Sequence, residues 1–279
     1  MKVSTKRFSH YWYDVGLEKP NKALSWTLLP NTNFYEIAVI SDLHFGNLCQ
    51  QKTMLSNFIA LCKERSINTL LCAGDLTDGL MSYKGHEKER FLHSGYSYEE
   101  YLEDNYPYME NNFIISGNHD NSIKKYENEN YDFCRELCKT RKDLKYHVAQ
   151  ENNLTKPFNL KGNIKLTLYH GSNCVNPAMK QRREPKLQQK TAEILSNNYN
   201  NHIIIFGHCH RKCITNFMNT YILGAGCFVA DTQYQIDRGT FGDVCGLIIK
   251  YVAEKGRVVC LETEFFSADQ LGGIKKRDF

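Results

Sequence analysis

The sequence lacks the features of disordered, exported and membrane-spanning proteins. Only six of its 279 residues are proline, and the composition is 42% hydrophobic and 24% charged without a low-complexity tract, so we expect disorder only at the ends of the chain. No run approaches the roughly 18 apolar residues of a membrane span, and residues 11–14 interrupt the apolar stretch that a signal peptide needs. We therefore predict a cytoplasmic protein that has no membrane partner.

The chain also lacks a strong charge imbalance and a zinc-finger pattern. Its net charge of +4 is compatible with anionic substrates, but it is too small to establish a nucleic-acid partner. The cysteines are numerous, eleven in all, and without an export signal we expect free thiols. Cys209 and Cys213 lie close to two histidines, but no second pair of ligands accompanies them, so a structural zinc site is not expected.

The length fits one large domain. Residues 1–33 are polar and aromatic, and we interpret them as an N-terminal extension of unknown role, whereas residues 34–279 form the main domain. From Phe34 a strand, a helix over 52–65 and a second strand over 67–73 follow one another, an order that predicts a right-handed parallel unit.

Strands and helices alternate in the first half of this domain, whereas strands dominate the second half. The pattern predicts an α/β fold of two packed mixed sheets with helices outside. We expect a long loop at residues 78–96 and a second loop at Gly171–Lys190, which is the most basic part of the chain. The tail at 275–277 is expected to fray. Further strands are expected at 113–116, 164–169, 202–206, 220–223, 244–251 and 257–266, and helices near 98–105, 131–142 and 187–196.

Five short polar motifs each follow an apolar strand. The loops at the carboxyl ends of the strands of an α/β sheet meet at one edge, where sites are usually built, so we expect the five motifs to form one site. Each motif alone has an ordinary explanation, such as a turn or a structural histidine, but chance is a poor explanation for all five on one chain. The motifs are Ser41-Asp42-Leu43-His44, Gly74-Asp75-Leu76-Thr77-Asp78, Gly117-Asn118-His119-Asp120, Tyr169-His170-Gly171 and Gly207-His208-Cys209-His210.

The spacing within the motifs favours metal binding. Asp42 and His44 are two residues apart on what we expect to be an extended segment, so their side chains point the same way while Leu43 points into the core. His208 and His210 repeat this arrangement. A glycine precedes the polar residues of three motifs and is expected to permit a sharp turn. Oxygen and imidazole ligands without thiolate favour Mn, Fe, Zn or Co.

The order of the motifs resembles that of the calcineurin-like metallophosphoesterases, and the resemblance extends over about residues 37–266. It implies a four-layer α/β/β/α sandwich with two divalent metal ions at the strand ends. Manganese is the metal we favour, with iron, zinc, cobalt or nickel as alternatives. By this resemblance the first ion would bind Asp42, His44, Asp75 and His210, and the second would bind Asp75, Asn118, His170 and His208.

The resemblance implies hydrolysis of a phosphate ester without a covalent intermediate. Two divalent ions about 3.5–4 Å apart can hold a shared water, lower its pKa and aim the resulting metal-bridging hydroxide at a phosphorus atom. His119 would protonate the leaving oxygen or stabilise charge on the phosphoryl group, and Asp120 would orient the imidazole of His119. Asp78 is expected to anchor its loop or to support a ligand.

The motif Gly-Asn-His-Asp is similar to that of phosphodiesterases and of DNA-repair-exonuclease-like phage and bacterial members of the family. Together with the basic loop, it favours a phosphodiesterase or nuclease that acts on nucleic acid or a nucleotide. Candidate substrate contacts are Arg182, Arg183, His86 and His93. A phosphomonoesterase acting on a small metabolite or phosphoprotein and a non-catalytic metal-binding interaction subunit are the alternatives, and the sequence leaves the oligomeric state open.

Overall fold

The computed structural model describes residues 34–279 except for five internal segments, 81–82, 128–129, 149–154, 172–182 and 197–201. The predicted extension at 1–33 lies outside the described residues. Within the described part of the chain, no helix is both long and apolar enough to cross a membrane.

A six-stranded mixed sheet carries three of the five motifs. Its strand order is β11-β10-β1-β2-β3-β4. β1, β2, β3 and β4 are parallel, whereas β10 and β11 extend the sheet in antiparallel pairing. Hence the carboxyl ends of the first three strands lie at the same edge. The strands are β1 (Phe34–Ile40), β2 (Thr69–Cys72), β3 (Asn111–Ile114), β4 (Leu144–Tyr146), β10 (Cys245–Glu254) and β11 (Arg257–Ser267).

A five-stranded mixed sheet carries the other two motifs. Its order is β5-β6-β7-β9-β8, with β6, β7 and β9 parallel and the outer strands antiparallel. The alternation of side chains along these strands gives the sheet two apolar faces, so both faces must be covered. The strands are β5 (Phe158–Leu160), β6 (Ile164–Tyr169), β7 (Ile203–Phe206), β8 (Lys212–Phe217) and β9 (Thr220–Ala225).

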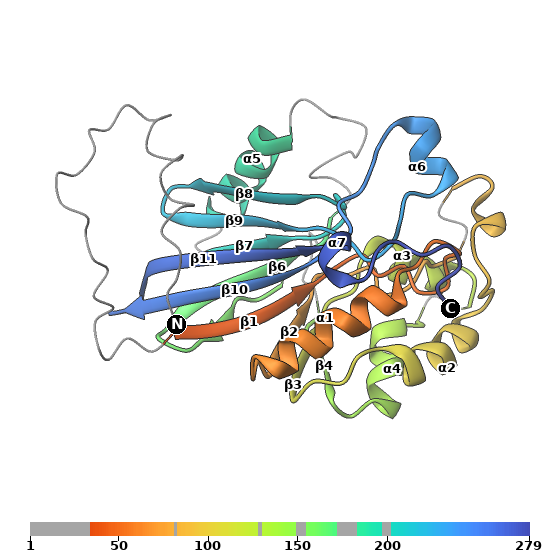
Figure 1. Cartoon of the computed structure of the whole chain (residues 1–279), viewed down its shortest axis with the longest axis horizontal. Coiled ribbons are helices and arrows are strands. Elements are labelled where there is room, and N and C mark those ends of the chain that lie inside the picture. Colours follow the sequence, from red (N-terminus) through yellow and green to blue (C-terminus); the bar gives the residue numbers. More distant parts are fainter. Residues whose placement is uncertain (1–33, 81–82, 128–129, 149–154, 172–182, 197–201) are drawn as a thin grey trace. The chain divides into compact units, whose positions relative to one another are not determined.

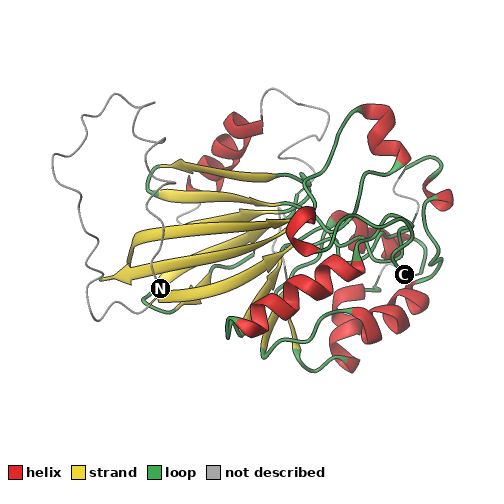
Figure 2. Cartoon of the chain, in the orientation of Figure 1, coloured by secondary structure: helices red, strands yellow, loops and turns green. Residues whose placement is uncertain are grey.

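Helices cover the outer faces of the two sheets (Figure 1). Helices α1, α2 and α4 lie on the side of β1–β4, and α5 lies beside β8 and β9 (Figure 2). Short helices occur in the loops that surround the strand ends. The helices are α1 (Lys52–Glu64), α2 (Gly95–Asn105), α3 (Asn118–Ser122), α4 (Phe133–Thr140), α5 (Arg183–Ser196), α6 (Gln233–Arg238) and α7 (Ala268–Leu271), with 3-10 turns η2 (His86–Lys88) and η3 (Ile123–Lys125).

Three separate apolar clusters hold the layers together. Alternate residues of β1 fall into different clusters: Ile40 packs with Phe58 of α1, whereas Val39 packs with residues of the five-stranded sheet. The far face of that sheet contributes Ile204 to a third cluster, which includes Ile194 of α5. Three cores between four layers confirm the predicted α/β/β/α sandwich.

The predicted elements are confirmed where the apolar pattern is long, and they are wrong where it is short or exposed. The strand expected at 164–169 has those bounds, and the helix expected at 52–65 ends at Glu64. The predicted basic loop is wrong from Arg183 onward, because α5 begins there and buries Ile194 completely. The edge strand β8 was not predicted, since its alternate residues are exposed and only its other face is covered.

The carboxyl-terminal tail is not frayed, contrary to expectation. Asp278 is 8% exposed, and its carboxylate accepts hydrogen bonds from the backbone N–H of Thr53 at 2.5 Å and from the Thr53 hydroxyl at 2.6 Å. Gln51 exchanges two further hydrogen bonds of 2.8 Å with the backbone of Lys275. The tail therefore caps the first turn of α1, where a negative charge is favourable.

We expect Asp278→Ala to lower the free energy of unfolding by about 0.5–2 kcal/mol, because the first turn of α1 loses its acceptor. Lys276→Ala, a change at an exposed residue of the same tail, should alter it by less than about 0.5 kcal/mol. Urea unfolding followed by circular dichroism measures both. Equal effects of the two substitutions would contradict the capping role.

Candidate metal centre

The five motifs meet at one end of the two sheets. Three of them follow β1, β2 and β3, and the other two follow β6 and β7, which are parallel strands of the second sheet. Backbone hydrogen bonds join the first two motifs, since the N–H groups of Asp42 and Leu43 donate to the carbonyls of Gly74 and Asp75 at 3.0 and 2.8 Å. The predicted meeting of the motifs at a common edge is therefore confirmed.

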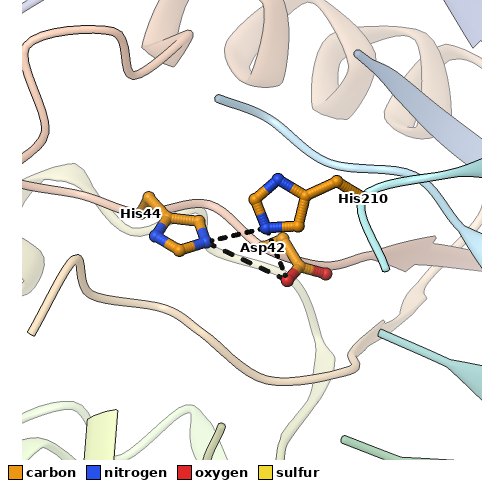
Figure 3. A group of neighbouring side chains, drawn as sticks. All are labelled: Asp42, His44 and His210. Carbon is orange, nitrogen blue, oxygen red and sulfur yellow. Dashed lines mark hydrogen bonds and ion pairs between the residues drawn. The ribbon is translucent and has the colours of Figure 1, made fainter. Parts of the chain in front are cut away.

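One group of potential ligand atoms comes from the first and last motifs (Figure 3). Nε2 of His210 lies 3.2 Å from Oδ1 of Asp42 and 3.1 Å from Nε2 of His44. Nε2 of His44 lies 3.9 Å from the same carboxylate oxygen. Asp42 is fully buried and His44 is 4% exposed, whereas the side chain of His210 is 16% exposed, so solvent reaches this group mainly at His210.

A second group comes from the middle motifs. Asp75, His170 and His208 offer ligand atoms that lie within 4.8 Å of one another. Nε2 of His170 is 3.0 Å from Oδ2 of Asp75 and 3.2 Å from Oδ1 of Asn118. The same Oδ2 lies 3.8 Å from Nε2 of His44 in the first group. Asp75 therefore stands between the two groups, as the family resemblance implies.

The backbone of the ligands is not extended, and this part of the prediction is wrong. Five of the expected ligands adopt left-handed conformations, which are uncommon for residues other than glycine and cost of order 1–3 kcal/mol in a strained site. The side chains of Asp42 and His44 converge because the chain turns at both residues, not because they alternate along a strand. The φ angles are 51° at Asp42, 46° at His44, 52° at Asp75, 70° at His208 and 51° at His210.

The main effect of the motif glycines is to let neighbouring loops approach one another closely, and only one of them serves a turn. Of the three, only Gly74 has a left-handed backbone, with φ of 92°. A β-carbon on Gly74 would lie 2.6 Å from the ring of His170. One on Gly117 would overlap the carboxylate of Asp75, and one on Gly207 would overlap the carbonyl of Ala73. Loops from different strands can meet only because these positions carry no side chain.

The donor atoms fit a pair of divalent cations. Nδ1 of His44 lies 2.9 Å from Oδ1 of Asp78, and Nδ1 of His170 lies 2.6 Å from the carbonyl oxygen of Ala73. Both oxygens are acceptors, so each Nδ1 carries a hydrogen and the neutral ring presents the lone pair of Nε2 to the site. Oδ2 of Asp75 is buried without a hydrogen-bond donor. Lone pairs that face one another in a buried site are stabilised by a cation between them.

The electrostatics of the side chains around Asp75 also favour a cation. Burial alone would raise the pKa of Asp75, but the positive charges of His170 and His119 bring it well below its ordinary value. Burial disfavours protonated His170, yet the Asp75 carboxylate raises the pKa of His170 to about 9. Burial and the charge of His170 lower the pKa of His208 to about 4. A second proton on the His170 ring would lie on Nε2, 3.0 Å from Oδ2 of Asp75, where it would replace part of the positive charge that a cation brings. Cation binding would release this proton and leave the ring neutral.

Asp120 has a different place from the one expected. Its carboxylate accepts hydrogen bonds from Gly117 N at 2.8 Å, from Leu76 N at 3.2 Å, and from both the backbone N–H and the hydroxyl of Thr77 at 2.9 Å. Burial and the charge of Asp75 raise the pKa of Asp120 to about 6. The hydrogen bonds of the Asp120 carboxylate therefore link the second motif to the third.

The imidazole of His119 is oriented by the Asp78 main chain. Nδ1 of His119 lies 2.6 Å from the carbonyl oxygen of Asp78, and its backbone N–H donates to Oδ1 of Asp75 at 2.8 Å. The prediction that Asp120 orients this ring is corrected accordingly. The side chain of His119 is 14% exposed, about as open as that of His210 at 16% and more open than those of Asp42, His44 and Asp75.

The four expected substrate contacts have different outcomes. His86 is fully buried, and its Nε2 lies 2.7 Å from Oδ2 of Asp78, so it does not fit a direct substrate contact and that expectation is corrected. His93 is exposed. Arg183 is the first residue of α5, and Arg182 lies outside the described residues.

Gln235 of α6 is a contact that sequence reasoning missed. Its Nε2 lies 3.2 Å from Nδ1 of His210. Its Oε1 accepts a hydrogen bond of 3.0 Å from the backbone of Thr232, so the side chain is held on both sides. A glutamine in a short polar helix carries no sequence signal for such a role, since nothing in the motif order places α6 beside the ligands.

We expect Asp75→Asn to weaken the binding of both ions by more than about 100-fold, because loss of a shared ligand exceeds the 10- to 100-fold effect of an outer partner. The amide keeps the acceptor that faces the His119 N–H but removes the ligand oxygen Oδ2. Asp42→Asn should weaken the binding of only one of the two ions to that degree. Calorimetric titration of metal-free protein with Mn²⁺ measures this, with circular dichroism to show that each variant is folded. Two ions bound by Asp75→Asn with unchanged affinity would refute the bridging role.

Comparison with known proteins agrees with this arrangement of motifs. The sequence profile of the calcineurin-like phosphoesterases matches residues 35–230. No curated protein sequence matches the chain.

Three solved structures are among those to which the chain is similar. Vacuolar protein sorting 29 from Cryptosporidium parvum is 16% identical, with 85% of this chain and 100% of that chain covered and a TM-score of 0.46. A novel archaeal phosphodiesterase is 12% identical, with coverage of 82% and 99% and a TM-score of 0.44. A putative 5′-nucleotidase from Staphylococcus aureus is 15% identical, with coverage of 84% and 54% and a TM-score of 0.44.

The profile spans well over half of the chain and includes all five motifs in full. Because the match has this extent, the chain belongs to the calcineurin-like phosphoesterase family.

Proposed function

We propose that the protein is a dinuclear-metal-dependent phosphoester hydrolase that acts as a phosphodiesterase or nuclease. The observation that carries the proposal is Oδ2 of Asp75, a buried oxygen that has no hydrogen-bond donor when His170 is neutral and that lies 3.0 Å from Nε2 of His170 and 3.8 Å from Nε2 of His44. When bound there, two divalent ions supply Lewis-acid chemistry, since they polarise phosphoryl oxygens and lower the pKa of a water molecule.

His119 is the proposed catalytic residue of the chain itself. Its Nδ1 is engaged by the carbonyl oxygen of Asp78, which leaves Nε2 as the nitrogen that can hold or transfer a proton. The His119 ring packs edge-on against that of His44, with centroids 4.5 Å apart. It therefore lies next to the ligands while remaining partly open, as a group that donates a proton to a leaving oxygen must be.

The proposed preference for diesters has its own grounds in the sequence. It rests on the Gly-Asn-His-Asp form of the third motif and on the basic segment around Arg182 and Arg183. These two arginines and His93 are the proposed contacts to a nucleic acid or nucleotide. A phosphomonoesterase would use the same ligands, so the substrate must be decided by assay.

A non-catalytic metal-binding subunit is the remaining alternative. Such a protein would need the ligands but would have no need of a proton donor. The presence of His119, held at both its ring and its backbone, favours turnover over this alternative.

We expect purified protein loaded with Mn²⁺ to hydrolyse bis-p-nitrophenyl phosphate and single- or double-stranded DNA or RNA, and to hydrolyse p-nitrophenyl phosphate more slowly. Removal of metal with EDTA should abolish the activity, because the buried carboxylates then lack their cations. Readdition of Mn²⁺, Zn²⁺, Fe²⁺, Co²⁺ or Ni²⁺ would rank the metals by the activity that each restores. Activity on monoesters alone would overturn the diester assignment, and no activity on any ester would overturn the hydrolase assignment.

We expect His119→Ala to lower kcat by about 10²- to 10⁴-fold, the usual contribution of a general acid, with metal affinity unchanged. Steady-state kinetics on the diester and calorimetry with Mn²⁺ test the two parts. Asp120→Ala is the matched comparison, because it leaves several buried donors without an acceptor and should lower the free energy of unfolding by at least about 2 kcal/mol. If His119→Ala kept full activity, its assignment would be wrong.

A further inference from the structure

Another group of potential ligand atoms lies beside the two groups described above. It consists of Asp78, His86 and His119. Its geometry is that of hydrogen bonding and not of a third cation site. Nε2 of His86 lies 2.7 Å from Oδ2 of Asp78, and Nδ1 of His119 lies 2.6 Å from the Asp78 carbonyl oxygen. A proton occupies each of these short contacts, whereas Oδ2 of Asp75 has no hydrogen-bond donor when the His170 ring is neutral.

Asp78 links this group to the metal ligands. Its Oδ1 accepts from Nδ1 of His44 at 2.9 Å, and its Oδ2 accepts from His86 and from Nδ2 of Asn47 at 3.0 Å. The Asp78 side chain is 2% exposed, so water does not replace a lost partner. Charge-assisted hydrogen bonds of this kind are roughly twice as strong as neutral ones. The position of the carboxylate therefore depends on all three donors.

His86 enters this network from a segment that supplies no metal ligand. The segment, residues 79–94 without the undescribed 81–82, pairs with the loop that follows the first motif. The N–H of Leu48 donates to the carbonyl of Glu89 at 2.7 Å, and that of Phe91 donates to the carbonyl of Gly46 at 2.8 Å. His86 is the buried residue of η2 within this segment.

The segment is also tied to α6. The ring of Tyr83 stacks on that of Tyr234 with centroids 4.1 Å apart. Oε1 of Glu89 accepts a hydrogen bond of 3.1 Å from the backbone N–H of Tyr234, and Tyr83 also hydrogen-bonds the Glu89 carboxylate. These contacts hold η2 in place, so the approach of His86 to Asp78 is fixed by packing and not by the hydrogen bond alone.

We propose that His86 is a positioning residue of the metal centre, which acts through Asp78 on His44 and on His119. By donating to Oδ2, His86 holds the Asp78 carboxylate where Oδ1 meets the imidazole of His44, and it holds the Asp78 carbonyl where it meets the imidazole of His119. The effect on His44 concerns metal affinity, and the effect on His119 concerns turnover. The second effect rests on the hydrolase function proposed above, whereas the first does not.

The test compares His86→Ala and His86→Gln with Glu87→Ala, a change at the exposed neighbour in η2. The Gln amide nitrogen can occupy the position of the imidazole Nε2 and donate to Asp78, whereas Ala leaves Oδ2 with Asn47 as its remaining side-chain donor among the hydrogen bonds described above. Each metal-free protein is titrated with Mn²⁺ in the calorimeter, at a temperature where circular dichroism shows that it is folded. Kinetics on bis-p-nitrophenyl phosphate are measured separately at saturating metal.

We expect His86→Ala to weaken one of the two Mn²⁺ binding steps by about 10- to 100-fold, the effect of removing an outer hydrogen-bond partner of a ligand. At saturating Mn²⁺ its kcat should fall at least 10-fold with KM within about 3-fold of wild type. His86→Gln should recover most of both losses, and Glu87→Ala should behave as wild type.

The outcomes separate the two proposals. Unchanged Mn²⁺ affinity in folded His86→Ala overturns the positioning role, and so does a His86→Gln protein that is as stable as wild type but keeps the full loss. If wild-type protein binds two ions but hydrolyses no ester, the proposed hydrolase function alone is overturned, because the affinity measurements still test the positioning of His44. Wild-type protein that binds no Mn²⁺ would overturn both.

Discussion

The buried carboxylate of Asp75 is the group on which the rest of the centre depends. A carboxylate with an oxygen that has no hydrogen-bond donor is costly in a protein interior unless positive charge compensates it. Here the compensation comes from imidazoles on three different loops, which must approach within a few ångströms. Gly117 and Gly74 lie in contact with Asp75 and His170, where a side chain would collide. The need to surround one oxygen thus explains the small residues, the strained backbone and the convergence of distant motifs.

The same requirement explains how far the sequence could be interpreted. The apolar runs predicted β1, β6 and α1 closely, because burial on one or both sides leaves a clear periodicity. The motif order placed Asp42, Asp75 and His210 in one site, which the structure confirms as neighbours. Their backbone geometry could not be predicted, since left-handed conformations at aspartate and histidine are imposed by tertiary contacts and are not encoded by a local pattern.

Other features were hidden because they depend on pairs of residues distant in the chain. Asp278 caps α1 through Thr53, but an acidic residue in a basic tail gives no sign of that contact. His86 stands in a polar segment without periodicity, where an exposed substrate contact was the natural interpretation. Only its burial and its distance to Asp78 show that it faces inward. Local sequence thus predicted which residues lie together at the candidate metal centre better than it predicted the residues that hold them in place.

The groups that hold the histidine rings in place differ from one expected ligand to the next: one is a backbone carbonyl, and the others are side chains. Nδ1 of His170 is held by a backbone carbonyl next to β2, which changes only if the sheet changes. Nδ1 of His44 and Nδ1 of His210 face side chains, Asp78 and Gln235. Those side chains belong to or contact the 79–94 segment and α6, which are joined by the Tyr83–Tyr234 stack. One side of the centre is therefore fixed by the sheet, whereas the other can be tuned by substitutions in peripheral segments that leave the apolar cores intact.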